Sequence, residues 1–113
     1  MPSLKSGKIQ EILKRSKRGE KITMLTAYDF PFASVIDACG IDIILIGDSL
    51  ANVVLGLKST KDVGMSEMLH HAKAVRRAVK SALLIGDMPF NSYQRHSKDA
   101  VKNAKRFMIR VKW

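Results

Sequence analysis

Three aspartates stand at the ends of three apolar, β-rich segments of the chain. Asp29 follows the first segment, and Asp48 and Asp87 each complete the repeated sequence Ile-Gly-Asp. The loops at the carboxyl ends of parallel strands carry the functional groups of α/β folds, so we expect the three acids to share one edge of a sheet. The glycine before the acid in each repeat would let the backbone approach a ligand closely.

The pair Asp48 and Asp87 predicts a site for a hard divalent cation. Magnesium is usually held by one or two carboxylates, with water and substrate oxygens completing its coordination. Aspartate after a strand also commonly caps a turn or a helix, and this alternative stays open for all three acids. Ser49 is expected to make hydrogen bonds rather than to act as a nucleophile, because the Gly-x-Ser-x-Gly elbow is absent around it.

Two other reactive residue types favour structural roles. His70 and His71 are adjacent in a helical segment, so their side chains point in different directions and are not expected to chelate one ion. The single cysteine, Cys39, cannot form an internal disulfide, and its place before Gly40 indicates packing rather than chemistry.

The elements that must position these residues alternate along the chain. Apolar, β-branched runs predict strands, residues with apolar positions at helical spacing predict helices, and the run 41–47 is apolar enough to be covered on both faces. The expected strands are 21–27, 41–47 and 81–86, and the expected helices are 30–39 (ended by Gly40), 66–79 and 97–110. A short amphipathic helix at 7–18, with Ile9, Ile12 and Leu13 on one side, precedes them.

Alternating strands and helices predict an α/β fold of right-handed parallel βαβ units. An open doubly wound sheet and a (β/α)₈ TIM-type barrel both fit. The turn at 26–31 lacks the glycine-rich phosphate cradle of a dinucleotide fold, which favours the barrel. A barrel needs eight strands and about 250 residues. We therefore expect residues 1–113 to form one partial barrel domain, the first three βα units, truncated before the fourth strand and prone to aggregate through its open edges.

Composition restricts the compartment and the partners. No apolar stretch is long enough to span a membrane and the start lacks a secretory signal, so we expect a cytoplasmic protein without a membrane partner. The net charge is +10, from 20 Lys and Arg against 10 Asp and Glu. The basic residues gather at 5–21 and 95–112 with a single aromatic residue, Phe107, among them, which favours solvated helix faces and no nucleic-acid partner. A basic nucleic-acid-binding module is the minor alternative.

Five motifs in order resemble the ketopantoate hydroxymethyltransferase family across residues 20–108. They are residues 23–29 (Thr-Met-Leu-Thr-Ala-Tyr-Asp), 44–50 (Ile-Leu-Ile-Gly-Asp-Ser-Leu), Gly56 with 59–60, His71 with 74–77, and 87–90 (Asp-Met-Pro-Phe) with 92–93. The resemblance implies a (β/α)₈ barrel, usually a homo-decamer. It also implies Mg²⁺ and transfer of a hydroxymethyl group from 5,10-methylenetetrahydrofolate to 3-methyl-2-oxobutanoate, giving 2-dehydropantoate for pantothenate and coenzyme A biosynthesis.

The same resemblance implies roles for three residues. Asp48 and Asp87 would bind the metal, and together with Ser49 they would contact the 2-oxo acid. The family's fourth strand ends in Val-Lys-(Ile/Leu)-Glu-Gly-Gly, whereas Val111 and Lys112 arrive a few residues early and no glutamate follows, so Lys112 inherits no role. The family's proton-abstracting base lies beyond residue 113, so no catalytic residue is expected here. The chain is then a transferase piece that needs a complementary chain, or an inactive remnant.

Overall fold

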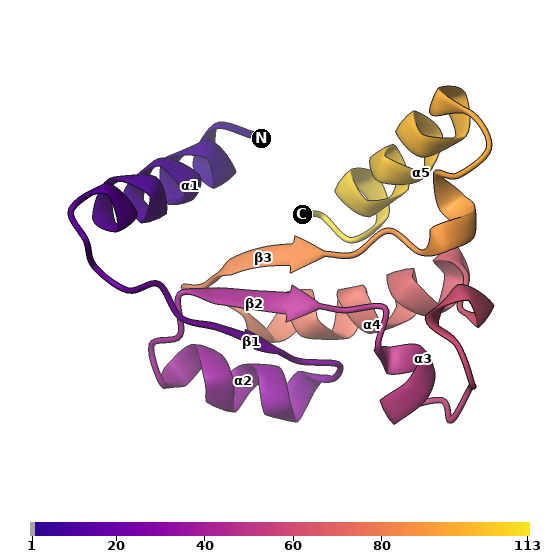
Figure 1. The fold of residues 1–113 in the computed structure, drawn as a ribbon. Coiled ribbons are helices and arrows are strands. Elements are labelled where there is room, and N and C mark those ends of the chain that lie inside the picture. The colour runs from indigo at the N-terminus through magenta and orange to yellow at the C-terminus, as the bar shows by residue number, and fades with distance from the viewer. Residues whose placement is uncertain (1) are drawn as a thin grey trace.

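A three-stranded parallel sheet lies at the centre of the molecule (Figure 1). The structure is a computed structural model that describes residues 2–113, with side chains from Gly7 onward. The strands are Met24–Thr26 (β1), Ile43–Ile46 (β2) and Leu83–Gly86 (β3). They lie in the order β1-β2-β3 and both pairings are parallel. Their carboxyl ends therefore meet at one edge, as the sequence predicts.

Helices connect and flank the strands, which confirms the α/β fold of alternating strands and helices. The helices are Pro2–Lys17 (α1), Phe30–Ala38 (α2), Leu50–Val53 (α3), Met65–Ala78 (α4) and Ser97–Arg110 (α5), with 3-10 turns at Thr60–Asp62 (η1) and Phe90–Ser92 (η2). The predicted ranges of α2, α4 and α5 agree within about one residue. The sequence missed α3, η1 and η2, because segments of three or four residues show no full helical period.

One face of the sheet carries the core. Ile44, Ile46 and Leu84 point to this face, where they are 0%, 0% and 4% exposed and pack with buried residues of α2 and α4. The opposite face is only partly covered, since Met24 is 52% and Ile85 39% exposed. The prediction that β2 is covered on both faces is therefore wrong within the described chain, because buried and half-buried residues alternate along it.

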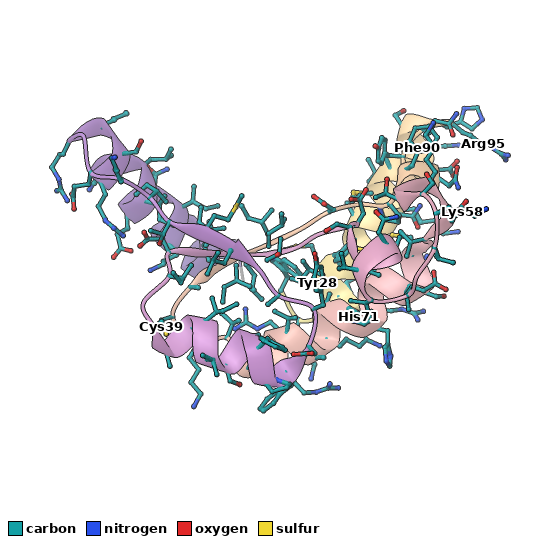
Figure 2. The ribbon with its side chains drawn as sticks, turned by 60° about the horizontal axis from the view of Figure 1, so that its bottom comes forward. Tyr28, Cys39, Lys58, His71, Phe90 and Arg95 are labelled. Carbon is teal, nitrogen blue, oxygen red and sulfur yellow. The ribbon has the colours of Figure 1, made fainter. Side chains whose placement is uncertain are left out.

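Local signals set the ends of α2. The Asp29 carboxylate caps the helix by accepting a hydrogen bond from the Phe32 backbone N–H at 3.0 Å. The helix ends at Ala38 with Cys39 as its C-cap, and Gly40 then adopts φ +81°, the left-handed conformation that glycine tolerates best. The predicted stop at Gly40 is confirmed. The prediction that Cys39 packs is wrong, because the residue is exposed at the end of α2 (Figure 2).

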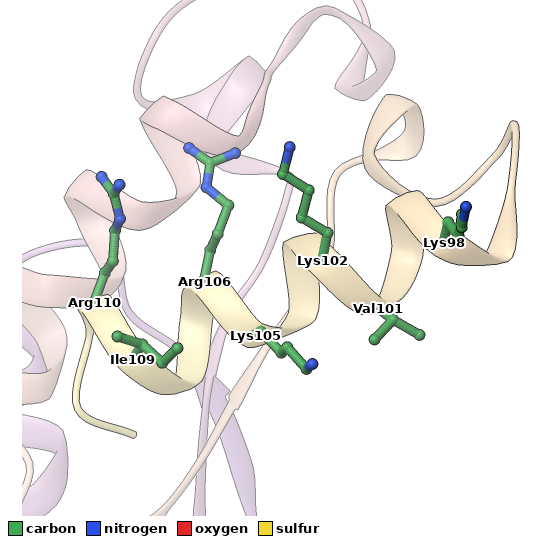
Figure 3. A pocket seen from close by; sticks show the side chains of 7 residues that line it. All are labelled: Lys98, Val101, Lys102, Lys105, Arg106, Ile109 and Arg110. Carbon is green, nitrogen blue, oxygen red and sulfur yellow. The ribbon is translucent and has the colours of Figure 1, made fainter.

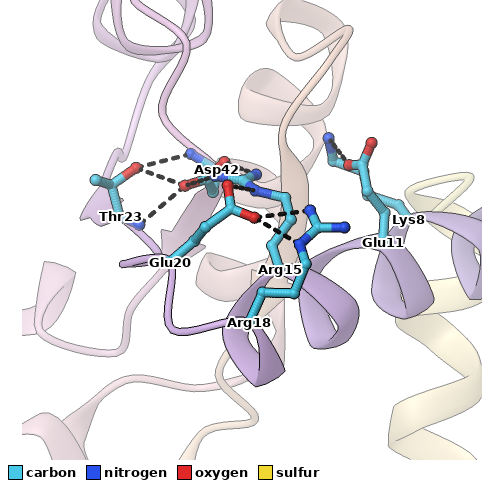
Figure 4. Close-up of polar contacts among 7 residues, drawn as sticks. All are labelled: Lys8, Glu11, Arg15, Arg18, Glu20, Thr23 and Asp42. Atoms are coloured by element: carbon cyan, nitrogen blue, oxygen red, sulfur yellow. Dashed lines mark hydrogen bonds and ion pairs between the residues drawn. The ribbon is translucent and has the colours of Figure 1, made fainter.

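An ion-pair network ties α1 to the start of the sheet (Figure 4). Asp42, just before β2, accepts hydrogen bonds from the Arg15 guanidinium at 3.3 Å and from the Thr23 backbone N–H at 3.0 Å. The hydrogen bond from Arg15, followed by that from Thr23, lowers the pKa of Asp42 from 3.8 to about 2. On α1 itself Ile12 is buried, whereas Ile9 and Leu13 are 43% and 48% exposed.

No helix in residues 2–113 combines the length and the apolar character that crossing a lipid bilayer requires.

Candidate functional site

The loops after β2 and β3 bring Asp48 and Asp87 together. The Asp48 backbone N–H donates a hydrogen bond to Asp87 Oδ2 at 3.0 Å, across 39 residues of sequence. The Asp87 backbone N–H in turn donates to Ile46 O at 2.9 Å, which continues the pairing of β2 with β3 beyond Gly86. The sheet itself therefore fixes the Asp87 carboxylate against the loop that carries Asp48.

Gly47 forms the floor of this site. A Cβ atom added there would lie 3.2 Å from Ser49 Oγ and 3.6 Å from Asp87 Oδ2, so both oxygens lie directly over the glycine. At the first Ile-Gly-Asp repeat, the groups that approach the glycine closely are the Ser49 and Asp87 side-chain oxygens. For the second repeat, the prediction of a ligand-facing glycine is wrong. A Cβ at Gly86 would lie 2.9 Å from Trp113 Cη2, so an indole ring occupies that space.

The electrostatics of the pair favour a bound cation. Partial burial, and then the neighbouring Asp87 carboxylate, raise the pKa of Asp48. Both causes penalise the charged form of Asp48, and a divalent cation would offset them. Residues 2–113 hold no cluster of three or more His, Cys, Asp or Glu side chains that could bind a metal. The described chain thus offers two carboxylates, which fits Mg²⁺ because this ion usually keeps several waters and binds few protein ligands.

A hydrogen-bonded chain leads from Ser49 to α4. Tyr28 Oη lies 2.7 Å from Ser49 Oγ, and His71 Nδ1 lies 2.7 Å from the Tyr28 carbonyl oxygen. Tyr28 and His71 lie close together near the end of β1 (Figure 2). The sequence motifs include both residues but assign neither a role. His70 is exposed, and its ring meets that of His71 edge-on at 5.6 Å, so the two do not converge on one point.

Asp29 stands apart from the other two acids. Besides capping α2, it lines a cavity of about 450 Å³ with Tyr28, His71 and apolar residues of α2 and α3, and neither Asp48 nor Asp87 borders this cavity. Of the alternatives left open by the sequence, the cap holds for Asp29. Asp48 and Asp87 cap no helix in the described chain.

The second basic run lies largely on α5. A cavity of about 500 Å³ along this helix is lined by cationic and aliphatic side chains only: Lys98, Val101, Lys102, Lys105, Arg106, Ile109 and Arg110 (Figure 3). No aromatic side chain lines it, so it offers no stacking platform for bases.

Comparison with known proteins identifies the family. The sequence model described as ketopantoate hydroxymethyltransferase matches residues 6–112, nearly the whole chain. The chain belongs to the ketopantoate hydroxymethyltransferase family. This is a family of transferases, and the resemblance stated from the motifs is confirmed.

Three relatives named 3-methyl-2-oxobutanoate hydroxymethyltransferase define how much of the family sequence is present. The chain is 54% identical to the relative from Ignicoccus hospitalis over 101 residues, which is 89% of the chain and 38% of that protein. It is 56% identical over 94 residues to that from Syntrophomonas wolfei (83% and 34%) and 58% identical over 91 residues to that from Clostridium botulinum (80% and 33%). The chain therefore spans about a third of the length of these ketopantoate hydroxymethyltransferases.

Proposed function

We propose that this chain supplies the substrate- and metal-binding part of a hydroxymethyltransferase site. The reaction would transfer a hydroxymethyl group from 5,10-methylenetetrahydrofolate to 3-methyl-2-oxobutanoate and give 2-dehydropantoate, in pantothenate and coenzyme A biosynthesis. The observation that carries the proposal is the convergence of Asp48, Ser49 and Asp87 over Gly47, at the carboxyl ends of two neighbouring strands. Functional groups of parallel α/β folds gather at this end of the sheet.

The three residues would have two different roles, metal binding and substrate binding. Asp48 and Asp87 would hold a Mg²⁺ ion, which as a Lewis acid supplies stabilisation of the negative charge that develops on the keto oxygen of the substrate. Ser49 would donate a hydrogen bond to an oxygen of the 2-oxo acid, because that oxygen can only accept. Asp87 is held by the Asp48 N–H, so its Oδ2 is already oriented before a ligand arrives. None of these three residues removes the substrate proton in this account.

The proposed architecture is the first three βα units of a (β/α)₈ barrel, acting in the cytoplasm without a membrane or nucleic-acid partner. Full-length members would assemble as homo-decamers. Met24 and Ile85 are exposed on the half-open face of the sheet. This face matches the interior side of a barrel whose other strands lie outside residues 1–113. We propose that turnover requires, besides residues 1–113, the remaining strands and the base, which the relatives would carry in the two thirds of their length that this chain does not cover.

A complementation assay tests this proposal. The chain is mixed with a polypeptide comprising the remaining two thirds of the Syntrophomonas wolfei relative, and 2-dehydropantoate is measured with Mg²⁺, 3-methyl-2-oxobutanoate and methylenetetrahydrofolate. We expect product from the mixture and from neither part alone. Asp48→Asn and Asp87→Asn should each abolish it, whereas Asp29→Asn, which keeps a good helix cap, should retain it.

Two outcomes would contradict the proposal. Turnover by the chain alone would show that no complementary chain is needed. A mixture that forms a stable complex without turnover would favour the second candidate, a catalytically inactive remnant. A steeply salt-dependent association with duplex DNA would instead support the nucleic-acid alternative.

A further inference from the structure

We propose that Tyr28, held in place by His71, is a positioning residue that orients the Ser49 hydroxyl toward the 2-oxo acid. The inference rests on the proposed role of Ser49 as a substrate-binding residue. It concerns two residues that lie outside the pair of metal-binding acids and that reach the site from β1 and α4. The contacts that carry it join three segments, since Tyr28 is 21 residues from Ser49 and 43 from His71 in sequence.

The first step is the hydroxyl pair. Tyr28 Oη and Ser49 Oγ are 2.7 Å apart, the ordinary distance of an O–H···O hydrogen bond, and either oxygen could donate. A serine side chain has three staggered rotamers and a hydroxyl hydrogen that rotates freely. The Tyr28 ring packs against the hydrophobic core, so its hydroxyl is a fixed point from which one Ser49 rotamer is selected.

The second step gives this hydrogen bond a direction. The carboxylate and keto oxygens of a 2-oxo acid accept hydrogen bonds and donate none, so Ser49 must donate its only hydrogen to the substrate. Tyr28 then donates to Ser49 Oγ. The phenol hydroxyl therefore leaves the Ser49 hydrogen free for the ligand and aims it away from Tyr28.

The third step fixes Tyr28 itself. The last sheet hydrogen bond of this strand end runs from the Ala27 N–H to Leu45 O at 3.0 Å, so the Tyr28 carbonyl lies just beyond the ladder. His71 Nδ1 lies 2.7 Å from that carbonyl oxygen and must be the protonated donor, because a carbonyl only accepts. The next residue of α4, Ala72, is fully buried, so the helix that carries His71 is itself packed on the core.

The test measures the Ser49 rotamer directly. Side-chain coupling constants of Ser49 are recorded by NMR for the unchanged 113-residue chain and for Tyr28→Phe. Tyr93→Phe is the matched control, because the Tyr93 ring is exposed and lies outside the site. Tyr28→Phe keeps the packed ring and removes only the hydroxyl. We expect one rotamer in the unchanged chain and in Tyr93→Phe, and an average over several rotamers in Tyr28→Phe.

A pair of substitutions at His71 separates positioning from general stability. An asparagine places an amide N–H near the position of Nδ1, whereas leucine fills similar space without a donor. We expect His71→Asn to keep the single Ser49 rotamer and His71→Leu to lose it. The proposal is overturned if Ser49 keeps one rotamer in Tyr28→Phe, or if it already averages over several in the unchanged chain.

A binding measurement keeps this inference distinguishable from the proposed function. With Mg²⁺ present, Tyr28→Phe should raise the dissociation constant for 3-methyl-2-oxobutanoate about fivefold, the effect of losing one ordinary hydrogen bond. An unchanged constant would also overturn the proposal. If the unchanged chain binds no 2-oxo acid at all, the proposed function of this chain fails, while the rotamer measurement still decides whether Tyr28 orients Ser49.

Discussion

At the scale of single residues, the site leaves no room for a side chain at Gly47. A methyl group there would meet Ser49 Oγ at 3.2 Å, closer than nine in ten real Cβ contacts, so the serine side chain would have to give way by a few tenths of an ångström. Gly47→Ala should displace Ser49 from Tyr28 and lower the free energy of unfolding by about 1 kcal/mol, the lower end of the cost of overpacking. Gly7→Ala is the matched control, because nothing lies within 4 Å of its Cβ and alanine favours the helix. Urea denaturation of both variants would contradict this account if Gly47→Ala were as stable as the control.

The raised pKa of Asp48 gives the second prediction at this scale. A carboxyl whose pKa is higher in the folded state than in the unfolded state binds more protons when folded, so its contribution to stability falls as pH rises through that window. Without metal, Asp48→Asn should therefore be more stable than the unchanged chain at pH 7, and the difference should shrink as pH falls toward 4. Urea midpoints in the presence of a chelator measure it. If Asp48→Asn were less stable than the unchanged chain at pH 7, burial and Asp87 would not penalise the charged form of Asp48.

At the scale of elements, the lowered pKa of Asp42 predicts a stability that changes with pH in the opposite direction to that of Asp48. The folded pKa of Asp42, about 2, lies below the ordinary 3.8, so its contribution to stability is fully present above pH 4 and is lost as pH falls through about 2. Asp42→Asn should lower the urea midpoint at pH 6, because Arg15 of α1 loses its ion pair with Asp42, and the difference should close near pH 2. Lys8→Gln, which breaks the exposed pair between Lys8 and Glu11, should change little. Equal midpoints for Asp42→Asn and the unchanged chain at pH 6 would contradict the role of the network.

The elements also show what the sequence could predict. Continuous apolar runs and helical spacing are local signals, and they were enough to place β2, α4 and α5 and to bring Asp48 and Asp87 to one sheet edge. Contacts between distant segments leave no local signal. The indole of Trp113 covers Gly86, and the Tyr28 carbonyl meets His71 from 43 residues away, so neither contact followed from the pattern. The role of Asp29 could not be predicted from the sequence either, because a helix cap and a metal ligand both use an aspartate.

At the scale of the whole molecule, the three strands form a sheet whose two edges pair with no further strand of the described residues 2–113. β1 and β3 are edge strands, and exposed Met24 and Leu25 make the β1 edge apolar. At the β3 edge the Trp113 indole N–H donates to Leu84 O at 3.2 Å, which occupies one backbone acceptor there. Unpaired apolar edges template association with other chains. The exposed β1 edge and the half-open sheet face are therefore surfaces on which further strands could pair or pack.

We therefore predict concentration-dependent self-association of the isolated chain through the β1 edge. Leu25→Lys should reduce it, because a charge on an edge strand opposes pairing. Ile109→Lys, at a 73% exposed position on α5, should not. Sedimentation velocity over a range of concentrations measures both variants. A monodisperse monomer with a sharp, cooperative thermal unfolding transition would contradict this prediction.

The central claim is that Asp48 and Asp87 form the cation-binding half of a transferase site, and paramagnetic Mn²⁺ tests it most directly. Added to the isotope-labelled chain with 3-methyl-2-oxobutanoate, Mn²⁺ should broaden the amide signals of residues 47–49 and 86–88 first. The broadening should vanish in Asp48→Asn and Asp87→Asn and persist in Asp29→Asn. Broadening spread over exposed acids such as Asp62 and Asp99, and unchanged in the two variants, would contradict the claim.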